Sequence, residues 1–251
     1  MRTFGLIGYP LSHSFSQSYF TKKFRNENVA DCEYLNFPIS SIRELPSLLQ
    51  QYPTLEGLNV TIPYKQLVIP FLSSKNEVVA ATGACNCIRI NTDQQLHGYN
   101  TDVTGFEVSL LHQLKPFHTK ALILGTGGAA KAVAFVLQKL HITFLYVSRQ
   151  ESTHDKIHYN QLNRAILTEH LLIINATPVG MFPAEKDAPP IDFDAITPRH
   201  LLFDLIYNPA MTVFLSEGKK RGASIQNGYA MLEIQAEESW KIWNSVKAQS
   251  S

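Results

Sequence analysis

Two hydrophobic patterns alternate in the first hundred positions, with turn residues between them. One is a short continuous apolar run, which predicts a strand. The other is a stretch with apolar positions three and four apart, which predicts an amphipathic helix. The predicted strands cover residues 4–8, 32–37 and 57–60, followed by a hairpin of 87–90 and 96–99. The predicted helices cover residues 16–27, 47–52 and 75–82. This alternation predicts an α/β domain over residues 1–101.

The second half of the chain begins near Asp102 and has the pattern of a parallel sheet. A helical stretch over 103–114 leads into 120–124, a continuous apolar run typical of a strand buried on both faces. Further strands are predicted over residues 144–147, 171–175 and 201–205. Strands that alternate with helical or polar segments predict a Rossmann-like, doubly wound dinucleotide-binding domain over residues 102–229.

The last stretch of the chain predicts an amphipathic helix, because its apolar residues return at helical spacing over 229–246. Its apolar stripe consists of Leu232, Ala236, Trp240, Trp243 and Val246. Such a stripe needs a surface to cover, and periodicity does not show which domain offers it. We expect the segment 230–251 to pack back on the first domain.

Composition narrows the class of protein. Of the 251 residues, 45% are hydrophobic and 17% charged, which predicts a globular fold with a sizeable core. The net charge of +1 gives no electrostatic footprint for nucleic acid or a membrane surface. The short apolar start and the lack of long apolar runs predict a cytoplasmic protein. Cys32, Cys85 and Cys87 lack the partners of a zinc site, so no metal is expected.

A glycine-rich turn follows the predicted strand 120–124 and precedes a helical run over 131–137. It reads Gly125, Thr126, Gly127, Gly128, Ala129 and then Ala130. Glycines here let the backbone turn tightly and approach a pyrophosphate, whose charge the free N–H groups of a helix N-terminus favour. The alternative is a strand-to-helix turn in which the glycines serve packing alone.

The end of the next strand bears on which dinucleotide is bound. An NAD enzyme would offer an acidic side chain there to the ribose 2′-hydroxyl, whereas this chain has Ser148 and Arg149. A guanidinium favours a 2′-phosphate through paired, charge-assisted hydrogen bonds. The sequence therefore predicts NADP over NAD, although Glu151 stands close by. The alternative for Arg149 is a solvated loop cation.

Several polar motifs occur in a definite order along the chain. In the first half they are Gly8-Tyr9-Pro10-Leu11-Ser12-His13-Ser14, Asn59-Val60-Thr61-Ile62-Pro63-Tyr64-Lys65, Gly83-Ala84-Cys85-Asn86 and Gly98-Tyr99-Asn100-Thr101-Asp102. In the second half they are Gly125 to Ala130, Asn175 to Met181, Asp204 to Pro209 and Asn227 to Leu232. Together these motifs resemble those of the shikimate dehydrogenase family, over almost the whole chain.

The resemblance implies a reaction: the reversible, NADP-dependent reduction of 3-dehydroshikimate to shikimate, in chorismate and aromatic amino acid biosynthesis. It implies that Lys65 and Asp102 are catalytic. An ammonium beside the substrate carbonyl can donate a proton as hydride arrives, provided that burial lowers its pKa. A neighbouring carboxylate orients it but raises its pKa, so Lys65 is either the proton donor or a positioning cation.

The resemblance also assigns binding roles. The substrate residues it implies are Ser12, Ser14, Asn59, Thr61, Asn86, Tyr207 and Gln235. The cofactor residues it implies are Gly125, Thr126, Gly127, Gly128, Ala129, Ser148, Arg149, Thr177 and Gly228. For each polar side chain taken singly, capping or local backbone bonding is an alternative explanation. The expected partner is a small-molecule substrate bound by a monomer or homodimer, with the two domains closing for hydride transfer.

The chain departs from the family pattern at several positions. Cys87 replaces a threonine, and residues 17–19 lack the usual proline, histidine and asparagine. Ser148 and Gln150 differ from the usual neighbours of the arginine, and Tyr229 replaces a leucine.

Two alternative functions remain open. One is an NAD-using quinate and shikimate dehydrogenase, which the serines and Arg149 disfavour. The other is a non-catalytic nucleotide-binding sensor, which would need neither Lys65 nor Asp102.

Overall fold

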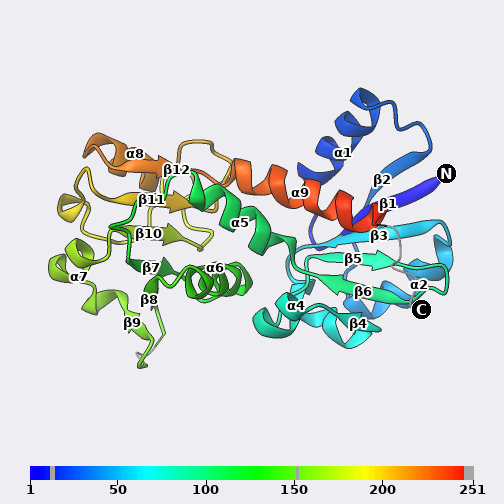
Figure 1. Cartoon of the computed structure of the whole chain (residues 1–251), viewed down its shortest axis with the longest axis horizontal. Coiled ribbons are helices and arrows are strands. Elements are labelled where there is room, and N and C mark those ends of the chain that lie inside the picture. The colour runs from blue at the N-terminus through cyan, green and yellow to red at the C-terminus, as the bar shows by residue number, and fades with distance from the viewer. Residues whose placement is uncertain (12–14, 151–152, 246–251) are drawn as a thin grey trace. The chain divides into compact units, whose positions relative to one another are not determined.

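The computed structural model of the chain describes residues 1–11, 15–150 and 153–245 and divides into two compact units (Figure 1). Unit 1 comprises Met1–Thr101 and Gln235–Ser251, and unit 2 comprises Asp102–Ile234. Two helices cross the division, α5 (Thr101–Leu111) and α9 (Tyr229–Asn244).

Unit 1 is built on a mixed sheet of six strands in the order β2-β1-β3-β5-β6-β4. The strands are β1 (Arg2–Ile7), β2 (Cys32–Phe37), β3 (Leu55–Val60), β4 (Ser74–Lys75), β5 (Cys87–Ile90) and β6 (Leu96–Tyr99). The helices are α1 (Phe15–Asn26), η1 (Ile42–Glu44), α2 (Leu45–Gln51), α3 (Tyr64–Leu67), η2 (Ile69–Phe71) and α4 (Glu77–Thr82). β1 runs parallel to both β2 and β3, whereas β5 is antiparallel to β3 and to β6.

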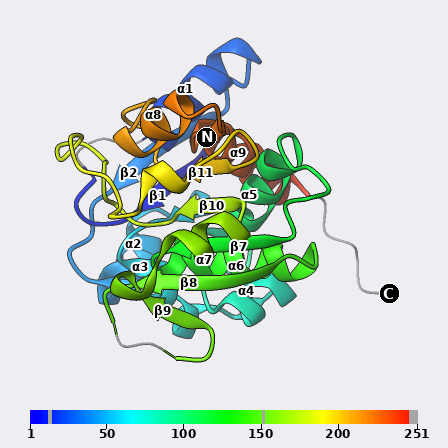
Figure 2. The same cartoon turned by 90° about the vertical axis from the view of Figure 1, so that its left-hand side faces the viewer.

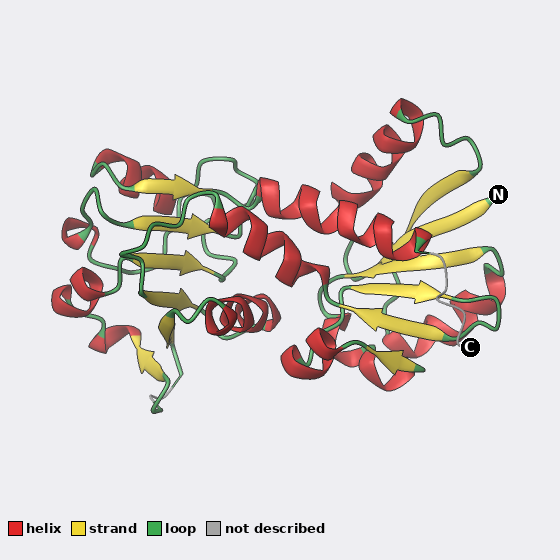
Figure 3. Cartoon of the chain, viewed as in Figure 1, coloured by secondary structure: helices red, strands yellow, loops and turns green. Residues whose placement is uncertain are grey.

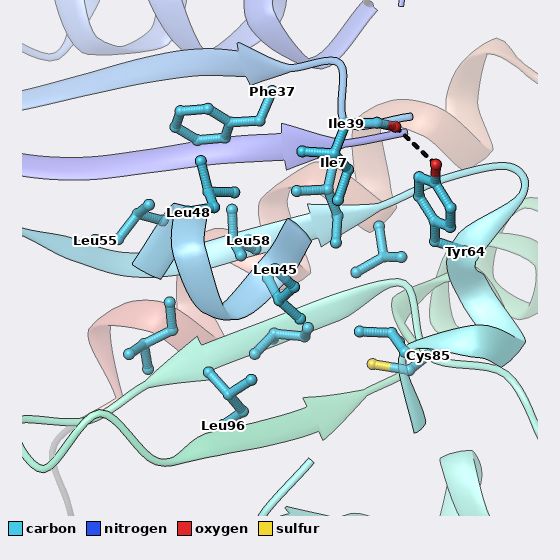
Figure 4. Close-up of a cluster of buried hydrophobic side chains, with 14 of the residues drawn as sticks. Ile7, Phe37, Ile39, Leu45, Leu48, Leu55, Leu58, Tyr64, Cys85 and Leu96 are labelled. Carbon is cyan, nitrogen blue, oxygen red and sulfur yellow. Dashed lines mark hydrogen bonds between the residues drawn. The ribbon is translucent and has the colours of Figure 1, made fainter. Parts of the chain in front are cut away.

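Alternate side chains of the strands fill a core on each face of this sheet. On one face, Phe4 of β1 stacks on Trp243 of α9 with ring centroids 4.9 Å apart, and Phe20 of α1 joins them. On the other face, Leu58 of β3 packs with Leu45 of α2 (Figure 4). The C-terminal part of α9 therefore belongs to the core of unit 1.

Unit 2 is a parallel sheet in the order β12-β11-β10-β7-β8-β9, and Figure 2 shows β11, β10, β7, β8 and β9 following one another from top to bottom. The strands are β7 (Lys120–Leu124), β8 (Thr143–Ser148), β9 (Lys156–His158), β10 (Leu172–Asn175), β11 (Leu201–Asp204) and β12 (Ser224–Gln226). Counted from β7, this is the 3-2-1-4-5-6 order of a doubly wound fold.

Helices cover both faces of the unit 2 sheet, and strands alternate with them along the chain (Figure 3). They are α6 (Gly128–Lys139), η3 (Tyr159–Gln161), α7 (Arg164–Glu169), η4 (Phe193–Ala195) and α8 (Val213–Lys220), besides α5. Phe214 of α8 and Leu167 of α7 pack on one face, whereas Phe106 of α5 meets Phe203 of β11 on the other. The predicted fold class, an N-terminal α/β domain and a Rossmann-like domain, is confirmed.

Candidate active site

Lys65 is carried by α3, a four-residue helix that the apolar pattern did not predict. Tyr64 anchors this helix: its ring is buried and its hydroxyl donates to the Ile39 carbonyl at 2.7 Å (Figure 4). From the other side, the Cys85 amide donates to the Lys65 carbonyl at 2.7 Å. The backbone of Lys65 is thus fixed between two buried residues, while its side chain is half-buried.

A cluster of buried polar side chains lies beside this helix in unit 1. The Asn86 side chain accepts from the Thr101 backbone amide at 2.6 Å and donates to the Thr101 hydroxyl at 3.0 Å. The Thr101 hydroxyl reaches Gln235 at 3.4 Å and Ser239 at 3.3 Å, both on α9. This brings Asn86 and Gln235, two predicted substrate residues, into one hydrogen-bonded cluster.

Asn59 belongs to the same cluster and has its amide fully engaged. Its Nδ2 donates to the Asn86 carbonyl and to the Ser239 hydroxyl, at 3.3 and 2.9 Å, and its Oδ1 accepts from Tyr34 at 2.8 Å. Burial raises the pKa of the Tyr34 hydroxyl well above its usual value, so Tyr34 remains a donor. The contacts of Asn59 are therefore those of a residue that holds Asn86.

Thr101, Ser239 and Tyr34 were not predicted as site residues. Ser239 lies one helical turn after Gln235 on α9, so the i, i+4 spacing was the available signal. Of the other substrate residues, Thr61 follows β3 and its amide donates to the Ile7 carbonyl at 3.0 Å. Ser12 and Ser14 lie outside the described residues.

The remaining predicted substrate and catalytic residues fall in unit 2. Asp102 stands in the first turn of α5 and is buried, with 9% of its surface exposed. Tyr207 follows β11 and is half-buried, and burial raises the pKa of its hydroxyl. Tyr207 therefore keeps its proton and can donate a hydrogen bond at neutral pH.

The glycine turn joins β7 to α6 and has the geometry of an anion cradle. Gly125 has φ of +105°, and a Cβ there would lie 2.9 Å from Cγ2 of Thr177. Gly127 is the N-cap of α6 but supplies no side-chain hydrogen bond, and added Cβ atoms at Gly127 and Gly128 would meet no described atom within 4 Å. Space is therefore open beside the amino end of this twelve-residue helix, where free backbone amides favour a pyrophosphate.

A cavity of about 430 Å³ opens beside this turn. Gly125 and Thr126 line it together with Arg149 from the end of β8 and Thr177 from the end of β10. Tyr159 is another lining residue. Burial raises the pKa of its hydroxyl to about 12, and the positive charge of Arg149 opposes this shift. Apolar surface and one guanidinium therefore meet beside the turn, as a phosphorylated nucleoside requires.

Two predicted cofactor residues also have local structural roles. The Ser148 hydroxyl accepts from the Gln150 amide at 3.1 Å, which shapes the loop that carries Arg149. Gly228 packs so closely on Leu205, within unit 2, that a Cβ would lie 2.1 Å from the Leu205 carbonyl oxygen. The packing on Leu205 is a sufficient reason for glycine at this position.

Other features of the described residues bear on the choice of site. A larger cavity, of about 750 Å³, lies in unit 1 where β1 and β3 begin, and no predicted site residue lines it. The described part of the chain holds no group of three His, Cys, Asp or Glu side chains placed to bind a metal ion. Within that part, every helix is too short or too polar to cross a membrane.

The fold and the glycine turn define a dinucleotide-binding α/β protein with a second, mixed-sheet unit. Residues 6–88 match the family model of the shikimate dehydrogenase substrate binding domain. The chain is 34% identical to a shikimate dehydrogenase (NADP(+)) of Desulforamulus reducens, over 97% of this chain and 90% of that one. The chain belongs to the shikimate dehydrogenase family.

Solved structures agree with this assignment. Shikimate 5-dehydrogenase from Thermus thermophilus, in complex with NADP(H) and shikimate, superposes with a TM-score of 0.86 at 26% identity, covering 98% of this chain and 94% of that one. Quinate dehydrogenase from Corynebacterium glutamicum, in complex with NAD, has the same TM-score at 25% identity, covering 98% and 94%. The fold therefore accommodates both cofactors, and the choice between them depends on side chains.

Proposed function

We propose that this chain catalyses the reversible reduction of 3-dehydroshikimate to shikimate with NADPH. The observation that carries the proposal is Arg149 beside the glycine turn of a shikimate dehydrogenase family member. When bound, the nicotinamide supplies the hydride. The protein supplies binding, orientation and the proton. The reaction belongs to chorismate and aromatic amino acid biosynthesis, and we place it in the cytoplasm.

In this proposal, unit 1 binds the substrate and unit 2 binds NADP. Asn86, Thr61 and Gln235 hydrogen-bond the substrate hydroxyls and carboxylate, joined by Tyr207 from unit 2 and by Ser12 and Ser14. Asn59 acts through Asn86, because its own amide is engaged inside the cluster. The cluster is preorganised by buried hydrogen bonds, so little reorganisation is needed when substrate arrives.

Cofactor binding is assigned to three parts of unit 2. The turn from Gly125 to Ala129 receives the pyrophosphate at the amino end of α6. Arg149, on the loop that Ser148 shapes, pairs with the 2′-phosphate. Thr177 lines the same cavity beside the turn, and Gly228 lets the chain pass close to Leu205 before α9.

Lys65 and Asp102 are the proposed catalytic pair. The Lys65 ammonium donates a proton to the substrate carbonyl oxygen as that oxygen gains negative charge. In the reverse direction, Lys65 takes the proton back from the alcohol. Asp102 orients the ammonium and accepts from a substrate hydroxyl. Tyr64 and Cys85 anchor the backbone of Lys65, which restricts the positions that its ammonium can occupy. This favours a proton donor held in place.

The test is an assay of NADPH formation at about 340 nm, the absorbance of the reduced nicotinamide, with shikimate and NADP⁺. Parallel reactions with quinate and with NAD⁺ separate the proposal from a quinate dehydrogenase. We expect shikimate with NADP⁺ to give the highest kcat/KM. A higher value for quinate with NAD⁺ would establish the rival activity, and binding without turnover would identify a sensor.

A further inference from the structure

The carboxyl ends of β10 and β11 are joined by two fully buried polar residues outside the catalytic pair. Asn175 ends β10 and Asp204 ends β11, they are partners in the parallel register, and neither has exposed surface. Asn175 Nδ2 donates to Asp204 Oδ1 at 3.0 Å. A buried carboxylate normally pairs with a cation, yet this one accepts from an amide.

The Asn175 side chain holds the loop that lines the cofactor cavity. Its Oδ1 accepts from the Thr177 amide at 3.1 Å and from the Thr177 hydroxyl at 2.6 Å. Its Nδ2 donates to the Val179 carbonyl at 3.3 Å, and the Thr177 hydroxyl accepts from the Val179 amide at 3.2 Å. The primary amide therefore bonds the loop at three points and Asp204 at a fourth.

This loop meets the glycine turn directly. Cγ2 of Thr177 is the nearest atom to a Cβ placed on Gly125, and the Ala176 amide donates to the Leu124 carbonyl at 2.9 Å. Thr177, Pro178 and Val179 all line the 430 Å³ cavity. A shift of the loop would therefore change the wall of the cavity and the space above the turn.

Asp204 is itself held by neutral donors from three segments. Besides Asn175, its Oδ1 accepts from the Ile206 amide at 3.0 Å, and its Oδ2 accepts from the Thr212 hydroxyl at 2.6 Å. Thr212 is also the N-cap of α8. None of these donors titrates near neutrality. Burial raises the pKa of Asp204 to about 6, in spite of the three hydrogen bonds, which lower it.

We propose that Asn175 and Asp204 are positioning residues that set the Thr177–Val179 wall for the cofactor. Asp204 orients the Asn175 amide so that its carbonyl faces Thr177, and the amide fixes the loop. Neither residue touches the cofactor in this assignment. The inference rests on the proposed function only because NADPH is the ligand used to measure it.

The experiment compares KM for NADPH and for 3-dehydroshikimate at a temperature well below thermal unfolding. Asn175→Ala removes all the bonds between this side chain and the loop, and we expect KM for NADPH to rise about tenfold because the cavity wall is no longer held in place. The KM for 3-dehydroshikimate should change less than about twofold. Asp204→Ala should act in the same direction.

Two matched variants separate positioning from general destabilisation. Asp204→Asn keeps a carbonyl oxygen that accepts from Asn175 and Ile206, and its amide NH₂ group can donate to the Thr212 oxygen. Unlike Asp204→Ala, it should therefore have a KM for NADPH within about twofold of the native value. Thr212→Val removes the bond to the other carboxylate oxygen of Asp204, Oδ2, and the cap of α8, and leaves the bonds of Asn175 in place. It should lower the thermal midpoint and leave KM for NADPH unchanged.

Several outcomes would overturn the inference. One is a native KM for NADPH in folded Asn175→Ala, and another is an equal rise of KM for NADPH and KM for 3-dehydroshikimate in that variant. A third is a rise of KM for NADPH in Thr212→Val that accompanies its loss of stability. If Asn175→Ala does not fold, the contrast between Asp204→Ala and Asp204→Asn decides the question. Equal KM values for NADPH in those two variants would also refute it.

Direct titration of NADP⁺ by calorimetry keeps this test separate from that of the proposed function. A native protein that binds NADP⁺ but does not oxidise shikimate would refute the function, while a weaker Kd in Asn175→Ala would still support the positioning role. An active native enzyme whose Kd is unchanged by Asn175→Ala would refute the positioning role alone.

Discussion

The indole of Trp243 lies so close over Gly57 that a Cβ on the glycine would be 2.4 Å from Nε1. The same Nε1 donates to the Ile88 carbonyl at 3.0 Å, so Trp243 cannot move without breaking a buried hydrogen bond. We expect Gly57→Ala to lower the free energy of unfolding by about 2 kcal/mol, as overpacking does in a dense core. Urea denaturation followed by tryptophan fluorescence measures the change.

The same contact fixes the helix α9 that carries Gln235 and Ser239, so Gly57→Ala should also raise KM for shikimate. Gly83→Ala is not a suitable control, because Gly83 has φ of +62°. Gly128→Ala is a control for the stability measurement alone, since a Cβ there meets no described atom within 4 Å but the residue belongs to the proposed pyrophosphate turn. Equal unfolding midpoints for native protein and Gly57→Ala would show that the indole has room to move.

Gly127→Ala should separate cofactor binding from stability. Gly127 has φ of −74° and open space at its Cβ position, so alanine fits the backbone. A methyl group at the N-cap of α6 would stand where the proposed pyrophosphate approaches the helix amides. We expect Kd for NADP⁺ to rise about tenfold or more, equivalent to ~1.4 kcal/mol, with an unchanged thermal midpoint. Unaltered NADP⁺ binding would remove the turn from the site.

The strands were predictable because their cause is local. Buried parallel strands such as 120–124 are continuous apolar runs, and the glycine turn is set by backbone conformation. The short elements were not predictable. α3 spans four residues, too few for a period of 3.6, and the edge strands β9 and β12 are short and largely polar. The helix that carries Lys65 is held by Tyr64 and Cys85, contacts that no local pattern contains.

The candidate site shows the same division. The sequence motifs contain Asn59 and Asn86, so both were predicted as site residues. Ser239 was not predicted, because a serine within a helix has the pattern of a surface residue. Its role follows only from packing, which places its hydroxyl 2.9 Å from Nδ2 of Asn59, 180 residues away in the chain. Conversely, the packing of Gly228 on Leu205 accounts for a glycine that the motif assigned to the cofactor.

Removal of the proposed catalytic pair should lower turnover far more than binding. Lys65→Met keeps the length of the side chain and abolishes the ammonium, and kcat should fall by roughly 10²–10⁴-fold, the usual contribution of a general acid. Asp102→Asn should lower kcat less. If the two groups act as a unit, the double variant should be little worse than Lys65→Met. Steady-state kinetics in both directions measures these changes, and fully additive losses would mean independent roles.

Arg149→Ala should alter the choice of cofactor. The guanidinium is exposed at the rim of the cavity, so its removal should not affect folding. We expect kcat/KM for NADPH to fall about tenfold or more, since charge-assisted hydrogen bonds contribute about 1.5–3 kcal/mol, while kcat/KM for NADH stays nearly constant. Arg25→Ala, an exposed arginine in unit 1, is the control. Equal losses with both cofactors would assign Arg149 a role other than 2′-phosphate binding.

Stability below neutral pH should depend on His118, which is buried just before β7. Its Nδ1 accepts from the Lys115 amide and its Nε2 donates to the Arg199 carbonyl, each at 3.0 Å, so the ring fits as the neutral form. Burial lowers the pKa of His118 below its usual value. As pH falls, the ring is therefore protonated in the unfolded chain at a higher pH than in the folded protein. The stability contributed by the neutral His118 ring is present above about pH 6.5 and is lost as pH falls below it.

The contribution of His118 can be isolated by difference. Asp204 has the opposite sign, since its pKa is raised to about 6 and the stability it contributes is lost as pH rises through that value. His118→Asn retains an acceptor for the Lys115 amide and does not titrate. Urea denaturation at pH values from about 7.5 to 5 should show a smaller loss of stability on acidification than in the native protein. His141→Asn is the matched control, because His141 is exposed with φ of 55°, which asparagine adopts readily. A slope that His118→Asn leaves unchanged would mean that protonation of this ring does not oppose folding.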